Sequence, residues 1–203
     1  MKSLKLLGIA ALAMLVIVAG LYWNRQDRAP SDAPDRAADI VQVSRQILEA
    51  LRARDGDGLA AWVHPTKGVR FSPYAYVDVQ RDRVFSREQI RGFWDDRTVH
   101  LWGYQDASGE PIALTAAQYC ERFVLDRNYL EATSINVNAD RAHGNTVNNA
   151  GEVYPKGTRV EYYIEPPPGE DAPEFGWSAL RVVFENLDGR WFLIAIIHDQ
   201  WTT

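Results

Sequence analysis

The chain has 203 residues, of which 46% are hydrophobic and 11% aromatic, so it can hold one folded domain with a real core. Its formal net charge is −5, with acidic and basic residues interspersed. This argues against nucleic acid as the main partner, because no basic stripe is present to neutralise phosphates. The single cysteine, Cys120, excludes an intrachain disulfide and is expected to be a buried, inert thiol.

Residues 6–23 contain no charged side chain and, as a helix, would rise about 27 Å, close to the ~30 Å thickness of a bilayer core. Lys2 and Lys5 precede this span, and Tyr22 and Trp23 lie at its outer end, where interfacial aromatics are expected. The pattern predicts a single-pass anchor in a bacterial inner membrane, with the rest of the chain on the periplasmic side. The alternative is a cleaved signal peptide, which would leave the domain periplasmic or secreted.

Residues 24–36 are polar and carry two prolines, so they read as a linker before an exported domain over residues 37–203. The domain is expected to begin with an amphipathic helix, since apolar residues recur at helical spacing at Ile40, Val43, Ile47 and Leu51. Gly56 is expected to end this helix, and Asp57 to cap a short second helix up to Val63.

Val69 and Phe71 begin an extended stretch that Pro73 confines to a sheet edge or a bend. Two capping boxes, Ser86 with Gln89 and Thr115 with Gln118, predict the starts of two further helices. Strands are expected at 99–104, 133–137, 158–164, 178–186 and 190–198, where β-branched and aromatic residues are frequent. Helices followed by a run of strands indicate the α+β class.

This order of elements is similar to the nuclear-transport-factor-2-like (NTF2-like, cone) architecture. That resemblance implies N-terminal helices packed on a curved antiparallel sheet, here preceded by one transmembrane helix. It also implies a ligand site in the concavity of the cone.

Three segments carry a more specific resemblance: HPTKGVRFSPY at 64–74, SGEPI at 108–112 and IIHDQW at 196–201. With Trp102–Tyr104 and Val153–Pro155, they resemble an uncharacterised family of exported bacterial proteins, many of them lipoproteins. The resemblance implies export and a common fold, and it supplies no activity. Because the chain lacks a lipobox cysteine, a helix is expected to replace the lipid.

Asp188-Gly189 is a strong two-residue hairpin signal between the last two strands. In the simplest register, an apolar face pairs Phe184 with Leu193, Val182 with Ala195, and Leu180 with Ile197. The other face then pairs Glu185 with Phe192, Val183 with Ile194, Arg181 with Ile196, and Ala179 with His198. This mixed face either meets solvent or lines a cavity under the helices.

The candidate pocket residues are His64, Arg70, Tyr74, Arg181, His198 and Gln200, and no catalytic residue is assigned. His198 and Asp199 are adjacent, so in a regular strand they point to opposite faces and form no dyad with each other unless a bulge intervenes. The four histidines show no metal-ligand spacing, and neither a phosphate loop nor a dinucleotide fingerprint is present, so neither metal nor cofactor is expected.

The leading hypothesis is a membrane-anchored, non-enzymatic domain that binds a small ligand in a cone-type pocket or a protein through its sheet. One alternative is an isomerase, dehydratase or hydrolase with acid–base histidine chemistry in the same pocket. Another is a structural envelope-assembly protein that uses the acidic, proline-rich loop 165–176. If the helices cover the concave face, homodimerisation through the convex face is expected.

Overall fold

The structure is a computed structural model that describes residues 33–139, 141–167, 169 and 175–202. The chain divides into two units, Met1–Ala38 and Asp39–Thr203, and in the first of them only residues 33–38 are described, as helix. The predicted anchor over residues 6–23 lies outside the described residues. Within the described ranges, no helix is long and apolar enough to cross a membrane.

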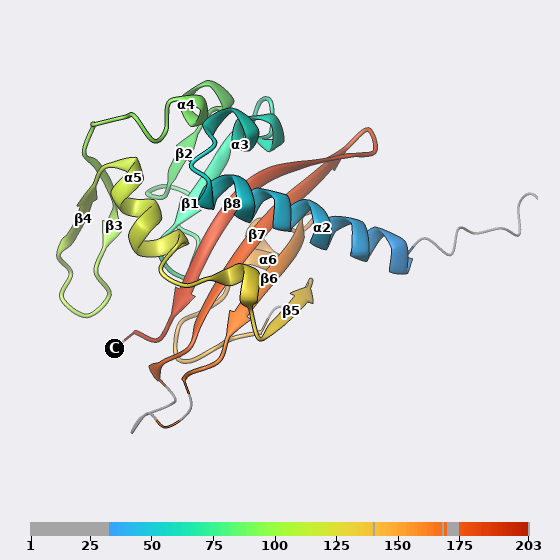
Figure 1. Ribbon diagram of the computed structural model, residues 1–203. Helices are drawn as coiled ribbons and strands as arrows, with labels where there is room; N and C mark the ends of the chain where they lie inside the picture. Colours follow the sequence, from blue (N-terminus) through green and yellow to red (C-terminus); the bar gives the residue numbers. More distant parts are fainter. Residues whose placement is uncertain (1–32, 140, 168, 170–174, 203) are drawn as a thin grey trace, which may run out of the picture. The chain divides into compact units, whose positions relative to one another are not determined.

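The described helices all precede β6 (Thr158–Ile164) in the chain, as the labels in Figure 1 show. They are α2 (Ala33–Arg52), α3 (Gly56–Trp62), α4 (Arg87–Arg91), α5 (Ala116–Tyr119) and α6 (Ala150–Val153), with a π-helical turn η1 (Cys120–Val124) and a 3-10 turn η2 (Tyr129–Glu131). The strands are β1 (Val69–Ser72), β2 (Arg83–Phe85), β3 (His100–Tyr104), β4 (Pro111–Leu114), β5 (Ser134–Val137), β6 (Thr158–Ile164), β7 (Ser178–Leu187) and β8 (Arg190–Gln200).

Six strands form one curved sheet in the order β2-β1-β8-β7-β6-β5, and β3 and β4 form a separate hairpin (Figure 1). Strand β1 runs parallel to β8, with Arg70 opposite Ala195 and Ser72 opposite Ile197. The sheet is therefore mixed, and the prediction of an antiparallel sheet is wrong at this pair. Of the two positions predicted for Pro73, a sheet edge or a bend, the structure shows the bend: β1 ends at Ser72 and the chain bends from Pro73 onward, while β2 pairs along the outer side of β1.

One face of the sheet packs against the helices and the β3–β4 hairpin, and this layer holds the main core. Aromatic rings fill its centre: Trp102 stacks on Tyr119 with ring centroids 3.8 Å apart, and Phe71 stacks on Phe93 at 5.3 Å. Cys120 is fully buried in the same layer, as its helical context predicted. The α+β class is thus confirmed, with α2 to α5 on one face of a curved sheet.

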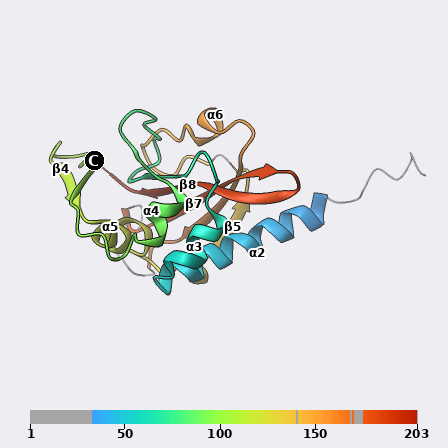
Figure 2. The same ribbon diagram turned by 90° about the horizontal axis from the view of Figure 1, so that it is seen from above.

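The opposite face of the sheet is covered as well. Val183, Ala195 and Ile197 form a second, smaller core with Val77 and Ala150, which come from the loop after β1 and from α6. Figure 2 shows α6 on the side of the sheet away from α3, α4 and α5. Val77 and Ala150 therefore cover the apolar residues on this face of the sheet. Homodimerisation through this face stays a prediction.

Local signals in the sequence account for several element ends. Both predicted capping boxes are present, at Ser86 and at Thr115. The Asp188-Gly189 turn is also confirmed, with φ of 52° and 82° as a two-residue hairpin requires. The predicted cap Asp57 is wrong, because the amide of Gly58 donates to Oδ1 of Asp55 at 2.9 Å and α3 starts at Gly56, two residues earlier than predicted.

A bulge in β8 changes the register predicted for the final hairpin. Phe184 lies opposite Leu193 as predicted, but Val183 lies opposite Ala195, so Ile194 has no partner across the strand. Beyond the bulge every residue of β8 is shifted by one. Val182 therefore pairs with Ile196, and Leu180 with His198, which correct the predicted pairs.

Candidate functional site

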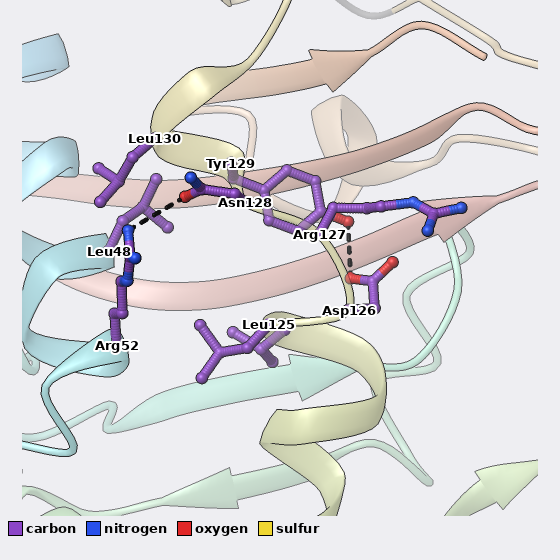
Figure 3. Close-up of a pocket in the computed structure, with 9 residues that line it drawn as sticks. Leu48, Arg52, Leu125, Asp126, Arg127, Asn128, Tyr129 and Leu130 are labelled. Atoms are coloured by element: carbon purple, nitrogen blue, oxygen red, sulfur yellow. Dashed lines mark hydrogen bonds between the residues drawn. The ribbon is translucent and has the colours of Figure 1, made fainter. Parts of the chain in front are cut away.

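A pocket of about 280 Å³ opens between the C-terminal half of α2 and the segment 124–130 (Figure 3). Its walls are apolar, with Leu48 from α2 and, from the facing segment, Val124, Leu125, Leu130 and the ring of Tyr129. This segment is irregular because a π-helical turn is followed by a 3-10 turn, which spreads the three leucine and valine side chains along the pocket.

Polar groups surround the mouth of this pocket. Arg52 and Arg127 are both exposed, and Nη1 of Arg52 donates to Oδ1 of Asn128 at 3.4 Å across the opening. Figure 3 shows Arg52 reaching from α2 toward Asn128, with Leu48 and Leu125 on either side. The pocket thus combines an apolar interior with a guanidinium held at its entrance.

Behind the pocket, Asp126 joins a buried polar network. The hydroxyl of Tyr129 donates to Oδ1 of Asp126 at 2.8 Å, and the hydroxyl of Ser178 donates to Oδ2 at 3.1 Å. Nε2 of His198 lies 3.4 Å from Oδ2 of Asp126 and 3.4 Å from Oγ of Ser178. Both carboxylate oxygens of Asp126 are therefore engaged on the protein side of the pocket.

The electrostatics of the network keep Asp126 ionised and Tyr129 neutral. Burial pushes the pKa of Asp126 up, but the hydrogen bond and charge of His198, with the hydroxyls of Tyr129 and Ser178, outweigh it and hold that pKa below its ordinary value. Burial, and then the negative charge of Asp126, raises the pKa of Tyr129 well above its ordinary range.

His198 is enclosed: only 1% of it is exposed, and Phe123 packs edge-on against its ring. Its Nδ1 lies 3.0 Å from the carbonyl oxygen of Pro73, an atom that can only accept. The carbonyl therefore fixes a proton on Nδ1, and Nε2 is the ring atom that can take up or release a proton toward Asp126.

His64, the first of the predicted candidates, lies apart from this network. It is 4% exposed, and its Nδ1 accepts the amides of Thr66 at 3.2 Å and Lys67 at 3.1 Å. Burial lowers its pKa, with a partial opposing effect from Glu185. These contacts close the turn between α3 and β1.

Arg70 lies on the face of the sheet away from His198, where its Nη1 donates to the carbonyls of Asp78, Val79 and Asp82 at 3.3–3.4 Å. It therefore holds the loop after β1. Tyr74 and Gln200 do come together, but at a second, separate pocket near the β3–β4 loop.

Arg181 is placed on the opposite face from His198 by the bulge, which corrects the predicted mixed face. It is 1% exposed and is held between two carboxylates: its Nε donates to Glu161 at 2.8 Å and its Nη2 to Asp199 at 2.9 Å. His143 completes the group, with Nε2 3.1 Å from Glu161. This charged group fastens the segment around residues 141–149 to the sheet.

The network partners of His198 escape prediction from the sequence. Asp126 and Tyr129 lie in a segment without periodicity, and Ser178 stands at the first position of a strand. The one sequence feature at Asp126 and Tyr129 is the run of polar residues Asp126–Asn128, which interrupts apolar residues at the end of a helix. Ser178 has no such feature.

In the described part of the chain, no group of three or more His, Cys, Asp or Glu side chains is placed to hold a metal ion. The groups gathered behind the pocket are one carboxylate, one imidazole and two hydroxyls, which can bind polar atoms and move protons.

No protein-family model matches the chain, and no curated protein sequence matches it at a significant level. Several solved structures match the chain at low sequence identity. An NTF2-like protein of unknown function from Shewanella oneidensis is 11% identical over 81% of this chain and 99% of its own, with a TM-score of 0.35.

Two further structures give similar values. A domain of unknown function with a cystatin-like fold from Nostoc punctiforme is 16% identical over 84% of this chain and 80% of its own, with a TM-score of 0.37. A calcium/calmodulin-dependent protein kinase II association domain from Xanthomonas campestris is 12% identical over 80% of this chain and 86% of its own, with a TM-score of 0.35.

Proposed function

We propose that residues 39–203 form a cone-type, NTF2-like domain that binds a small amphipathic anion in the pocket between α2 and residues 124–130. Support for the cone comes from helices packed on one face of a curved sheet, with the pocket opening beside α2. Apolar walls suit a short hydrocarbon group, because burying it removes apolar area from water.

The charge preference carries the proposal. Asp126 is the one carboxylate that lines this pocket, and both of its oxygens face Tyr129, Ser178 and His198. The charges left at the mouth are the guanidiniums of Arg52 and Arg127. A ligand with a carboxylate headgroup can pair with the guanidinium of Arg52 while its alkyl chain packs against Leu48.

Calorimetric titration of the full-length chain in lipid nanodiscs tests this function with three probes of one length: hexanoate, 1-hexanol and hexylammonium. Hexanoate is expected to bind most tightly. Arg52→Gln should weaken hexanoate binding about twofold to fivefold, the loss expected for one exposed charged contact, without changing the affinity for hexanol.

Arg81→Gln provides the matched control, because Arg81 is exposed and pairs with Asp78 in a loop away from the pocket. It should leave hexanoate binding unchanged. Equal affinities for the three probes, or equal effects of the two arginine substitutions, would count against an anion site at α2.

A second candidate function is acid–base catalysis on the bound ligand, favoured by the 3.4 Å approach of His198 Nε2 to Asp126. Two observations rank it second. His198 is only 1% exposed, and the lowered pKa of Asp126 makes that carboxylate a weak base. Deuterium exchange beside the ketone of 5-oxohexanoate in D2O tests it. Exchange that His198→Gln abolishes would establish catalysis, and a rate equal to the blank would leave binding alone.

Location at the membrane remains part of the proposal. Its support is the uncharged span over residues 6–23 with Tyr22 and Trp23 at its outer end. The envelope-assembly alternative rests on loop 165–176, in which residues 168 and 170–174 lie outside the described residues, and it stays a prediction.

A further inference from the structure

A second pocket, of about 510 Å³, lies where the end of β8 meets the β3–β4 hairpin. Both ribbon views show β8 running toward this hairpin (Figures 1 and 2). The pocket shares no lining residue with the one beside α2. It is therefore a separate site, and it brings together two of the predicted candidates, Tyr74 and Gln200.

The β3–β4 loop is held in a defined shape by its own hydrogen bonds. The amide of Gln105 donates to the carbonyl of Glu110 at 2.7 Å, and the amide of Gly109 donates to the carbonyl of Gln105 at 2.8 Å. The hydroxyl of Tyr74 donates to Oε1 of Gln105 at 3.3 Å and accepts the amide of Asp106 at 3.4 Å. A ligand would thus meet a loop already in place, which lowers the entropy cost of binding.

Besides hydroxyls, the polar lining contains planar groups that each offer two or more hydrogen-bonding atoms. Gln105 and Gln200 supply amides, Asp106 and Glu110 carboxylates, and Arg122 a guanidinium. Adjacent hydroxyls of one ligand can pair with both atoms of such a group. With two carboxylates and one guanidinium, the lining disfavours an anion and offers both donors and acceptors.

Two aromatic rings complete the pocket. Trp201 is half-buried and packs on Phe175, with ring centroids 4.2 Å apart, and Tyr74 packs on Phe123 at 6.2 Å. Both rings are thus braced from outside the pocket. A rigid aromatic surface among polar groups suits a ligand with an apolar C–H face and hydroxyls around its rim.

From this combination we propose that the pocket between the β3–β4 loop and the end of β8 binds a neutral saccharide. The sugar ring lies against Trp201, and its hydroxyls pair with the side chains of Gln105, Asp106 and Gln200. The size of the pocket suits one or two sugar units, since small-ligand pockets span roughly 300–1,000 Å³.

Saturation-transfer NMR and calorimetry on the full-length chain, kept in a detergent without a sugar headgroup, test the proposal. The probes are glucose, N-acetylglucosamine, cellobiose and chitobiose, each up to about 20 mM, the range of weak single-site binding. At least one is expected to bind. Trp201→Ala and Gln105→Ala should each weaken that binding about tenfold or more, whereas Trp201→Phe, which keeps a ring, should retain most of it.

Arg52→Gln serves as the control, because Arg52 lines the other pocket and should leave sugar binding unchanged. The proposal is overturned if none of the four sugars binds, or if a sugar binds equally well to wild type and to both alanine variants. If Trp201→Phe loses binding and also changes the circular dichroism spectrum, that variant is misfolded. The binding measured for Gln105→Ala then decides the outcome, since that side chain is on a surface loop.

Discussion

Ile194 and Ala195 are neighbours in β8, yet both pack into the small core on the α6 side of the sheet. This bulge places His198 on the helix-covered face, next to Asp126, and sends Asp199 to Arg181 on the other face. One unpaired residue thus decides which of two adjacent titratable side chains joins the network behind the pocket.

Asp126→Asn should destabilise the domain by about 1–2 kcal/mol at pH 7, because an amide replaces a carboxylate that accepts from two hydroxyls and faces His198. The folded pKa of Asp126 lies below its unfolded value, so this stability is present above about pH 4 and is lost as the pH falls through the folded pKa. Urea unfolding of both proteins from pH 7 to pH 3 measures the difference. A gap that widens toward pH 3 would contradict the assignment.

Asp82 should show the opposite pH dependence. Burial raises its pKa to about 6, although Ser72 and the amide of Asp78 donate to its carboxylate. A raised folded pKa means that the stability it contributes is complete below about pH 4 and is lost as the pH rises to about 6. Relative to Asp82→Asn, the wild type should gain about 1–2 kcal/mol as the pH falls over that window. A difference that does not depend on pH would argue against it.

Arg181→Met should destabilise the domain by about 3–5 kcal/mol, because the buried carboxylates of Glu161 and Asp199 lose their shared guanidinium. Adding Glu161→Gln and Asp199→Asn to the same chain should recover much of the loss. Thermal unfolding followed by circular dichroism measures both. Arg97→Met, at an exposed position, is the control and should cost less than about 0.5 kcal/mol. No recovery in the triple variant would show that the destabilisation has another cause than unpaired charge.

Cys120 should not react with a thiol reagent in the native protein. It is fully buried, and burial raises the pKa of its thiol well above the ordinary value, so no thiolate is exposed to attack. Ellman's reagent should therefore release colour from one thiol only after urea unfolding. Fast labelling in buffer would place Cys120 at an accessible position instead.

Residues 6–23 should retain the chain in the membrane fraction after a carbonate wash, because the span is long enough to cross and carries no charge. Placing Lys at residues 12 and 15 should release it, since each charge near the bilayer centre costs about 2.5–3.5 kcal/mol. A shortened mature protein in the periplasm would instead identify a cleaved signal peptide.

The sequence predicted the features that depend on neighbouring residues. Some features form within a few residues of chain, so the local order of residues reveals them. These are the capping boxes at Ser86 and Thr115 and the turn at Asp188-Gly189. The strands over 134–137, 158–164, 178–187 and 190–200 likewise follow from β-branched and aromatic runs.

Features that depend on distant contacts were not predictable in this way. Strand β8 contributes residues to two cores on opposite faces of the sheet, and the bulge at Ile194 fits it to both. No local sequence pattern indicates this bulge. Asp126 meets His198 across a long stretch of chain, from a segment without periodicity, and Ser178 meets His198 across the final hairpin. His64 and Arg70 stay predicted site residues, and in the structure both side chains make hydrogen bonds to backbone atoms nearby.

The position of β8 in the sheet also sets an order for folding. Among the described strands it comes last in the chain, yet it lies between β1 and β7. Until it emerges, the sheet exists as two separate pieces, β1–β2 and β5–β6–β7, each with an open edge of unpaired amides and carbonyls. Insertion of this one strand joins residues more than a hundred positions apart, so the sheet cannot be completed until the chain up to residue 200 is available, and we expect the isolated domain to fold slowly.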